Sequence, residues 1–157
     1  MIAARRLRRV SSVLGPVLKW FSAVFSVPIA TALYHGTSVV PFLVPLGLSF
    51  GAGALAEWIG GDSELTVQDG FLLVTLTWVL VSLLGSVPYL LSGTGSFATP
   101  INAIFESFSG FSATGSTILL DISIEKHGAA PLLWRTLTQW LAGMGIPALA
   151  VPALPPP

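Results

Sequence analysis

Long apolar runs separated by short polar segments set the pattern of this chain. One such run, residues 71–91, holds 21 residues without a charge. At 1.5 Å per residue, a helix of this length just spans the ~30 Å hydrocarbon core of a bilayer. Comparable runs cover residues 17–34, 39–58 and 131–154. The pattern predicts an all-α polytopic membrane protein with four transmembrane helices.

Details within the first two predicted spans suggest how they pack. Pro28 is expected to kink the first span, because proline removes a helix hydrogen bond. Lys19 is expected to extend its ammonium group to the membrane interface. The small residues of GAGALA (51–56) are expected to allow close approach of another helix.

The composition agrees with a lipid environment, since 53% of residues are hydrophobic and only 9% are charged. The net charge is zero, so nothing suggests a nucleic-acid partner. Five of the seven basic residues lie at or before the first span: Arg5, Arg6, Arg8, Arg9 and Lys19. The positive-inside rule therefore predicts a cytoplasmic N-terminus, residues 1–16. A secretory signal is the alternative, but Lys19 interrupts its apolar run and no clear cleavage site follows.

The connections and the last span complete this topology. Residues 59–70, with Asp62, Glu64 and Asp69, are predicted to form a solvated cytoplasmic loop. In the last span, Trp134 and Trp140 are predicted interfacial anchors, and Arg135 is expected to reach water or a headgroup. The two histidines are predicted to be exposed in outer loops: His35 and His127.

Residues 101–118 do not fit the pattern, because only eight of these eighteen residues are apolar. Thr99 and Pro100 predict a helix start, and a helix from residue 101 to about 112 would be ~18 Å long, roughly half a bilayer. Asn102, Glu106 and Ser109 fall on one face of it. A charge at mid-membrane costs about 3 kcal/mol, so Glu106 is expected to be paired or to face water.

Two interpretations of this segment remain open from the residues alone. A half-length helix followed by Gly and hydroxyl residues describes a re-entrant pore loop, whose carbonyls can replace the hydration shell of a cation. The alternative is an ordinary Ser/Thr-rich outer loop in which Gly115 only ends the helix.

Three blocks occur in a specific order: DGFLLVTLTWVLVSLLGSVPYLLSG, then NAIFESFSGFSATGSTIL, then LLWRTLTQWLAGMGI. Together they resemble the Trk/Ktr/HKT superfamily of potassium transporters, with TrkH-type membrane subunits as the nearest match. The resemblance implies four helix–pore loop–helix repeats in the family fold, of which residues 71–157 match the first. Residues 17–58 match the extra helix pair of TrkH-type subunits.

The resemblance also implies roles for individual residues. The carbonyls of Ser112, Ala113, Thr114 and Gly115 would form one quarter of a potassium filter, with Glu106 and Ser116 as support. A Ser in place of the filter Gly accompanies sodium permeation in some plant members, so Gly115 implies potassium. Arg135 matches a basic position of the family, which is an alternative to its role as an anchor.

The resulting hypothesis is potassium uptake across the cytoplasmic (inner) membrane by a fragment of a TrkH-type subunit. Its implied partners are membrane lipid, the remaining repeats, and a cytosolic nucleotide-binding regulatory subunit. No bound cofactor is expected besides the transported K+. The alternatives are a non-conducting assembly module and a homo-oligomeric cation channel. An enzyme is not expected, because no nucleophile–base pair or metal-ligand cluster appears.

Overall fold

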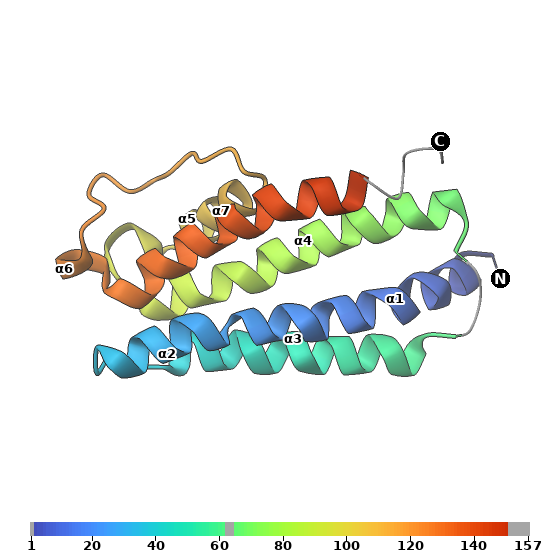
Figure 1. Cartoon of the computed structure of the whole chain (residues 1–157), viewed down its shortest axis with the longest axis horizontal. Helices are drawn as coiled ribbons and strands as arrows, with labels where there is room; N and C mark the ends of the chain where they lie inside the picture. The colour runs from blue at the N-terminus through green and yellow to red at the C-terminus, as the bar shows by residue number, and fades with distance from the viewer. Residues whose placement is uncertain (1, 62–64, 151–157) are drawn as a thin grey trace.

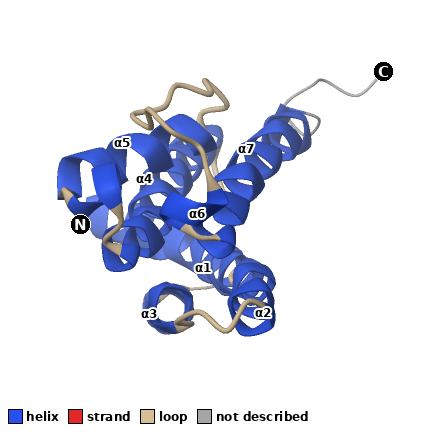
Figure 2. Cartoon of the chain, turned by 90° about the vertical axis from the view of Figure 1, so that its left-hand side faces the viewer, coloured by secondary structure: helices blue, strands red, loops and turns tan. Residues whose placement is uncertain are grey.

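The structure, a computed structural model, describes residues 2–61 and 65–150. These ranges contain helices and loops and no strand (Figures 1 and 2). In chain order the elements are α1 (Ile2–Val24), α2 (Ser26–Tyr34), α3 (Val40–Ile59), α4 (Val67–Ser92), the 3-10 turn η1 (Gly95–Ala98), α5 (Pro100–Phe111), α6 (Ile124–His127) and α7 (Ala129–Ala150). The all-α prediction is confirmed for the described part of the chain.

Three helical stretches in the described residues are long and apolar enough to cross a membrane: Arg5–Tyr34, Val40–Ile59 and Val67–Ser92. They confirm the first three predicted spans. The fourth predicted span coincides with α7 but is not among these three, and its residues 151–154 lie outside the described residues. It therefore stays a prediction.

The first span is longer than its apolar run and is broken once. Helix α1 runs from Ile2 to Val24 and α2 begins at Ser26; the single residue between them, Phe25, keeps helical backbone angles (φ −65°, ψ −15°). Pro28 lies in the first turn of α2. Because Pro28 has no amide hydrogen, it cannot bond to a carbonyl of the preceding turn, and the interruption at Phe25 lies three residues before it. The kink itself stays a prediction.

Small residues bring α1 and α3 together along their length. A Cβ placed on Gly53 would lie 2.7 Å from the carbonyl oxygen of Gly15, closer than side-chain atoms normally come. The expected close approach at 51–56 is thus confirmed at Gly53. Lys19 pairs with Glu57, two residues before the end of α3, and its side chain is 31% exposed. That Lys19 reaches the membrane interface stays a prediction.

A buried carboxylate joins α1 to the start of α4. Asp69 is fully buried and forms a reciprocal capping box with Thr66, whose hydroxyl donates to Asp69 Oδ2 over 2.7 Å. The guanidinium of Arg9 lies 2.8 Å from the same oxygen, and Arg6 lies 3.7 Å from Oδ1. The predicted solvated position of Asp69 is wrong because α4 begins at Val67. Asp62 and Glu64 lie outside the described residues.

An aromatic cluster holds the α1–α2–α3 layer against the α4–α5–α7 layer, and the two layers are seen end-on in Figure 2. Trp134 of α7 stacks on Phe25 with ring centroids 4.5 Å apart, and Phe21 packs edge-on against Phe111 of α5 at 5.8 Å. Trp134 is fully buried and donates its indole N–H to the Gly85 carbonyl over 2.9 Å. The prediction that Trp134 is an interfacial anchor is therefore wrong, whereas Trp140 is largely exposed.

Helix α5 has an unusual course. It starts at the end of the bundle where α4 finishes, runs part of the way back along α4, and gives way to an extended segment that returns to the same end at α6 (Figure 1). Pro100 occupies the first helical turn, as predicted, while Thr99 is the N-cap without a side-chain hydrogen bond. A helix of 12 residues is about 18 Å long.

The α1–α3 contact generates a test with an internal control. We expect Gly53→Leu to destabilise the fold by roughly 1–3 kcal/mol, because its side chain would meet the backbone of Gly15. Gly51 is the matched control, since a Cβ there meets nothing within 4 Å on the same helix. Thermal unfolding in detergent micelles measures both variants, and equal melting temperatures would contradict this packing.

Candidate functional site

The candidate site is the end of α5 together with the segment that follows it. We call residues 112–116 the 112–116 loop and residues 117–123 the return segment. The loop is exposed, whereas the α5 residues behind it are buried: Glu106, Ser107, Ser109, Gly110 and Phe111. An exposed loop thus rests on a buried polar helix face.

Glu106 is the centre of this buried face. Its carboxylate is 1% exposed and lies 2.6 Å from Arg135 Nε of α7. The Thr117 hydroxyl lies 2.9 and 3.0 Å from the two carboxylate oxygens, and the Ile118 amide donates to Oε2 over 3.1 Å. The carboxylate therefore ties the return segment to α5 and is neutralised by α7.

The ion pair between Glu106 and Arg135 bears on a prediction for each of these two residues. The expectation that Glu106 is paired or water-facing is confirmed by its pairing. The prediction that Arg135 anchors the chain at the interface is wrong, because its side chain is only 15% exposed and is directed to Glu106. A buried carboxylate needs a counterion and hydrogen-bond donors to compensate its lost hydration, and Arg135 with Thr117 and Ile118 supplies both.

Close packing brings α7 near enough to provide this counterion. Gly110 of α5 faces Thr138 of α7 so closely that a Cβ would overlap the Thr138 hydroxyl. Gly85 of α4 is similarly crowded, since a Cβ there would lie 2.5 Å from the Phe111 ring. Helix α5 is therefore held between α4 and α7 by contacts that leave no room for larger side chains.

The backbone of the 112–116 loop turns through two left-handed residues. Ala113 has φ +55° and Gly115 has φ +69°. Ala113 directly follows the helix cap, and its amide donates to the Gly110 carbonyl over 3.1 Å. The residue that ends the helix in left-handed geometry is thus Ala113 rather than Gly115. The simple helix-end interpretation of Gly115 does not account for its conformation.

Hydroxyl groups cross-link the loop to the helix end. Ser109 Oγ donates to the Ser116 carbonyl over 2.6 Å and lies 3.1 Å from Thr114 Oγ1. Ser112 Oγ lies 3.1 Å from the same Thr114 hydroxyl. Sequence reasoning placed Ser109 on the polar face but did not assign it this role.

The carbonyls of the predicted filter residues have a shared property. Among hydrogen bonds between described residues, none ends on the carbonyl oxygens of Ser112, Ala113, Thr114 or Gly115. Within 2–61 and 65–150, no group of three acidic, His or Cys side chains gathers that could hold an ion.

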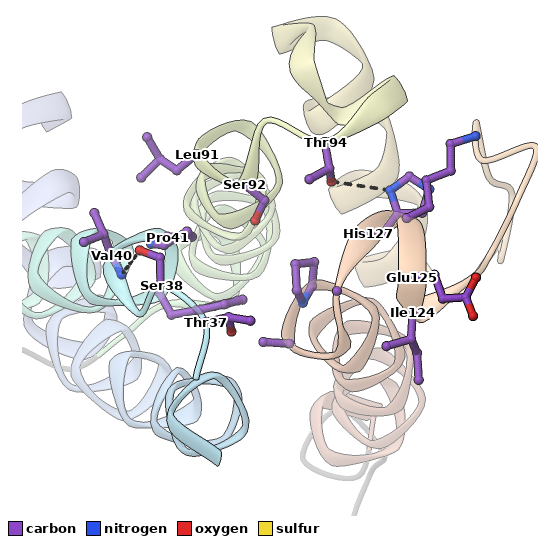
Figure 3. A pocket seen from close by; sticks show the side chains of 15 residues that line it. Thr37, Ser38, Val40, Pro41, Leu91, Ser92, Thr94, Ile124, Glu125 and His127 are labelled. Atoms are coloured by element: carbon purple, nitrogen blue, oxygen red, sulfur yellow. Dashed lines mark hydrogen bonds between the residues drawn. The ribbon is translucent and has the colours of Figure 1, made fainter. Parts of the chain in front are cut away.

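A separate pocket of about 710 Å³ lies where the α2–α3 turn, the end of α4 and α6 meet (Figure 3). His127 lines it and is 3% exposed, so its predicted exposure is wrong, whereas His35 is exposed as predicted. The His127 ring lies 3.4 Å from the Thr94 hydroxyl and 3.0 Å from the Asp121 carbonyl. These bonds fasten the outer part of the return segment, and the pocket includes none of the loop residues.

Comparison with known proteins agrees with the resemblance found in the sequence. The family described as "TrkH: Cation transport protein" matches residues 45–157. Trk system potassium uptake protein TrkH of Halomonas elongata is 39% identical over 152 residues, covering 95% of this chain and 31% of that protein. The TrkH proteins of Vibrio parahaemolyticus and Escherichia coli are 33% and 37% identical and are covered over 31% and 28% of their lengths. The chain spans about a third of the length of these curated relatives.

The buried ion pair generates a stability test. We expect Glu106→Ala to lower the free energy of unfolding by about 3–5 kcal/mol, because it leaves the Arg135 charge buried and unpaired. Glu125→Ala is the control, since Glu125 is exposed on α6 and its loss should change stability by less than about 0.5 kcal/mol. Thermal melts of both variants in the same detergent compare them. Indistinguishable melting temperatures would contradict the pairing.

Proposed function

The chain belongs to the TrkH cation transport family, and from that premise we propose that it is part of a potassium uptake protein. In this proposal the carbonyls of Ser112, Ala113, Thr114 and Gly115 supply one quarter of a filter that selects the transported K+. The family is defined by transport, which agrees with the prediction that the chain is not an enzyme. Three candidate spans and family membership make it a multi-pass membrane protein.

One observation carries the proposal: four consecutive loop carbonyls accept no hydrogen bond from the described residues, while the residues flanking them are held by the protein. At membrane depth, irregular backbone is stable only where protein or a water-filled cavity satisfies its polar groups. The Ser116 carbonyl is satisfied by Ser109, whereas the preceding four remain available to an ion. Ser116 and Glu106 act as support in this arrangement.

The chemistry we propose is exchange of hydration water for carbonyl oxygens, without a covalent step. The C-terminus of α5 faces the loop and adds partial negative charge, which favours a cation. Since Glu106 is neutralised by Arg135, the pair contributes little net charge to the ion path. The loop carbonyls and the helix end are then the groups that an approaching cation meets.

In this proposal the chain has four parts: a basic cytoplasmic N-terminus (1–16), the extra helix pair (17–58), a cytoplasmic loop (59–70) and the first helix–pore loop–helix repeat (71–157). The end of the bundle that carries Arg6, Arg8 and Arg9 would face the cytoplasm. The 112–116 loop would then be reached from the opposite side of the cytoplasmic membrane.

A longer protein would complete the filter. The apolar face of α5 is exposed, with Ile101, Ile104, Phe105 and Phe108 between 37% and 76% accessible. We propose that the remaining repeats cover this face, in keeping with relatives about three times as long. Membrane lipid would cover the outer faces of α3 and α4. A cytosolic nucleotide-binding regulatory subunit is proposed on the resemblance alone.

The same exposed face favours a second candidate function, in which copies of this chain associate with one another as a channel or as a non-conducting assembly module. Crosslinking in membranes distinguishes the possibilities. Tetramers with cation flux would support a homo-oligomeric channel, and co-purification with a longer Trk subunit without flux would support an assembly module.

Gly115 provides the functional test. We expect Gly115→Asp to abolish potassium-dependent growth of uptake-deficient cells that carry the longest reading frame containing this chain, because a carboxylate would intrude on the ion path. Gly36→Asp is the matched control, since Gly36 has φ +65° and open space around it but lies in the α2–α3 turn. Rubidium uptake measures both variants. Rubidium uptake by Gly115→Asp at the wild-type rate would contradict the filter proposal.

A further inference from the structure

One buried residue, Ser109, contacts three of the five residues of the 112–116 loop through its hydroxyl and its backbone carbonyl. Ser109 is 6% exposed, and its hydroxyl donates to the Ser116 carbonyl over 2.6 Å. Its carbonyl accepts from the hydroxyls of Ser112 and Thr114, each over 3.3 Å. Both ends of the loop are thus fastened to the same residue of α5, and the left-handed residues Ala113 and Gly115 lie between the fastened points.

Two residues earlier, Ser107 offers the same chemistry in a different direction. It is fully buried, and its hydroxyl donates over 2.6 Å to a carbonyl, but that carbonyl belongs to Ser82 of α4. Ser107 therefore holds helix to helix, whereas Ser109 holds helix to loop. Removing the Ser107 hydroxyl deletes one buried bond. Removing the Ser109 hydroxyl deletes a part-buried bond of equal length together with the weaker contact to the Thr114 hydroxyl, so the two variants should lose stability of the same order.

We propose that Ser109 is a positioning residue that fixes the spacing of the loop carbonyls and thereby contributes to discrimination between potassium and sodium. The inference rests on the proposed function of the loop. Ser109 donates a hydrogen bond to the Ser116 carbonyl, so this carbonyl is bonded to the protein. The four carbonyls before it stay free to bind an ion. Selectivity in such filters depends on the number and placement of the carbonyls that coordinate the ion. Loss of the bond from Ser109 to the Ser116 carbonyl would therefore change how many carbonyls can coordinate an ion and where they lie.

Hydrogen exchange on the 157-residue chain in micelles tests the positioning directly. Ser109→Ala should raise the exchange of peptides covering the 112–116 loop by roughly fivefold, the equivalent of one lost hydrogen bond, while Ser107→Ala should leave these peptides at the wild-type rate. Loop exchange that is unchanged in Ser109→Ala, or that rises equally in Ser107→Ala, would overturn the positioning role.

Selectivity is tested in uptake-deficient cells carrying the longest reading frame that contains the chain. We expect the ratio of rubidium to sodium uptake to fall several-fold in Ser109→Ala and to stay unchanged in Ser107→Ala, although both melt at similarly lowered temperatures. Equal ratios in the two variants would overturn the role in selectivity. If the wild-type gene gives no uptake, or Gly115→Asp is harmless, the proposed function itself fails, and hydrogen exchange still decides whether Ser109 holds the loop.

Discussion

The buried Glu106 carboxylate is the group on which the arrangement of the candidate site depends. Removing a carboxylate from water costs several kcal/mol, so this position is tolerated only because Arg135, Thr117 and the Ile118 amide converge on it. Their convergence requires α7 to lie very close to α5. That closeness in turn requires Gly110, whose missing side chain leaves space for α7. A single buried charge therefore constrains the packing of two helices and the course of the segment between them.

Helix α5 is oriented opposite to an ordinary surface helix, with its polar face buried and its apolar face exposed. On the buried face, Ser109 hydrogen-bonds to the 112–116 loop and Ser107 hydrogen-bonds to α4. The exposed face, with Ile101 and Phe105 among its most accessible residues, has the character of a surface that meets lipid or further protein. Both features suit a chain that covers about a third of its longer relatives. The polar loop is stabilised within the chain, while we propose that further protein covers the apolar face.

Much of this fold followed from residue patterns, and the exceptions share one cause. Apolar runs located three spans, and Pro100 located the start of α5, since length and proline geometry are local properties. The failures concern four residues that the sequence suggested to be accessible and that contact partners far along the chain: Asp69, Trp134, His127 and Arg135. Tertiary contacts of this kind leave no periodic signal in one sequence. Glu106 was an intermediate case, because the cost of a mid-membrane charge predicted a partner without identifying Arg135.

The most direct measurement is anomalous X-ray diffraction from rubidium-soaked crystals of the protein encoded by the longest reading frame that contains this chain. We expect an anomalous peak within coordination distance of the carbonyl oxygens of residues 112–115, with the Ser116 carbonyl still bonded to Ser109. Peaks elsewhere along the protein with none at this loop would contradict it. So would loop carbonyls that are fully hydrogen-bonded to protein groups.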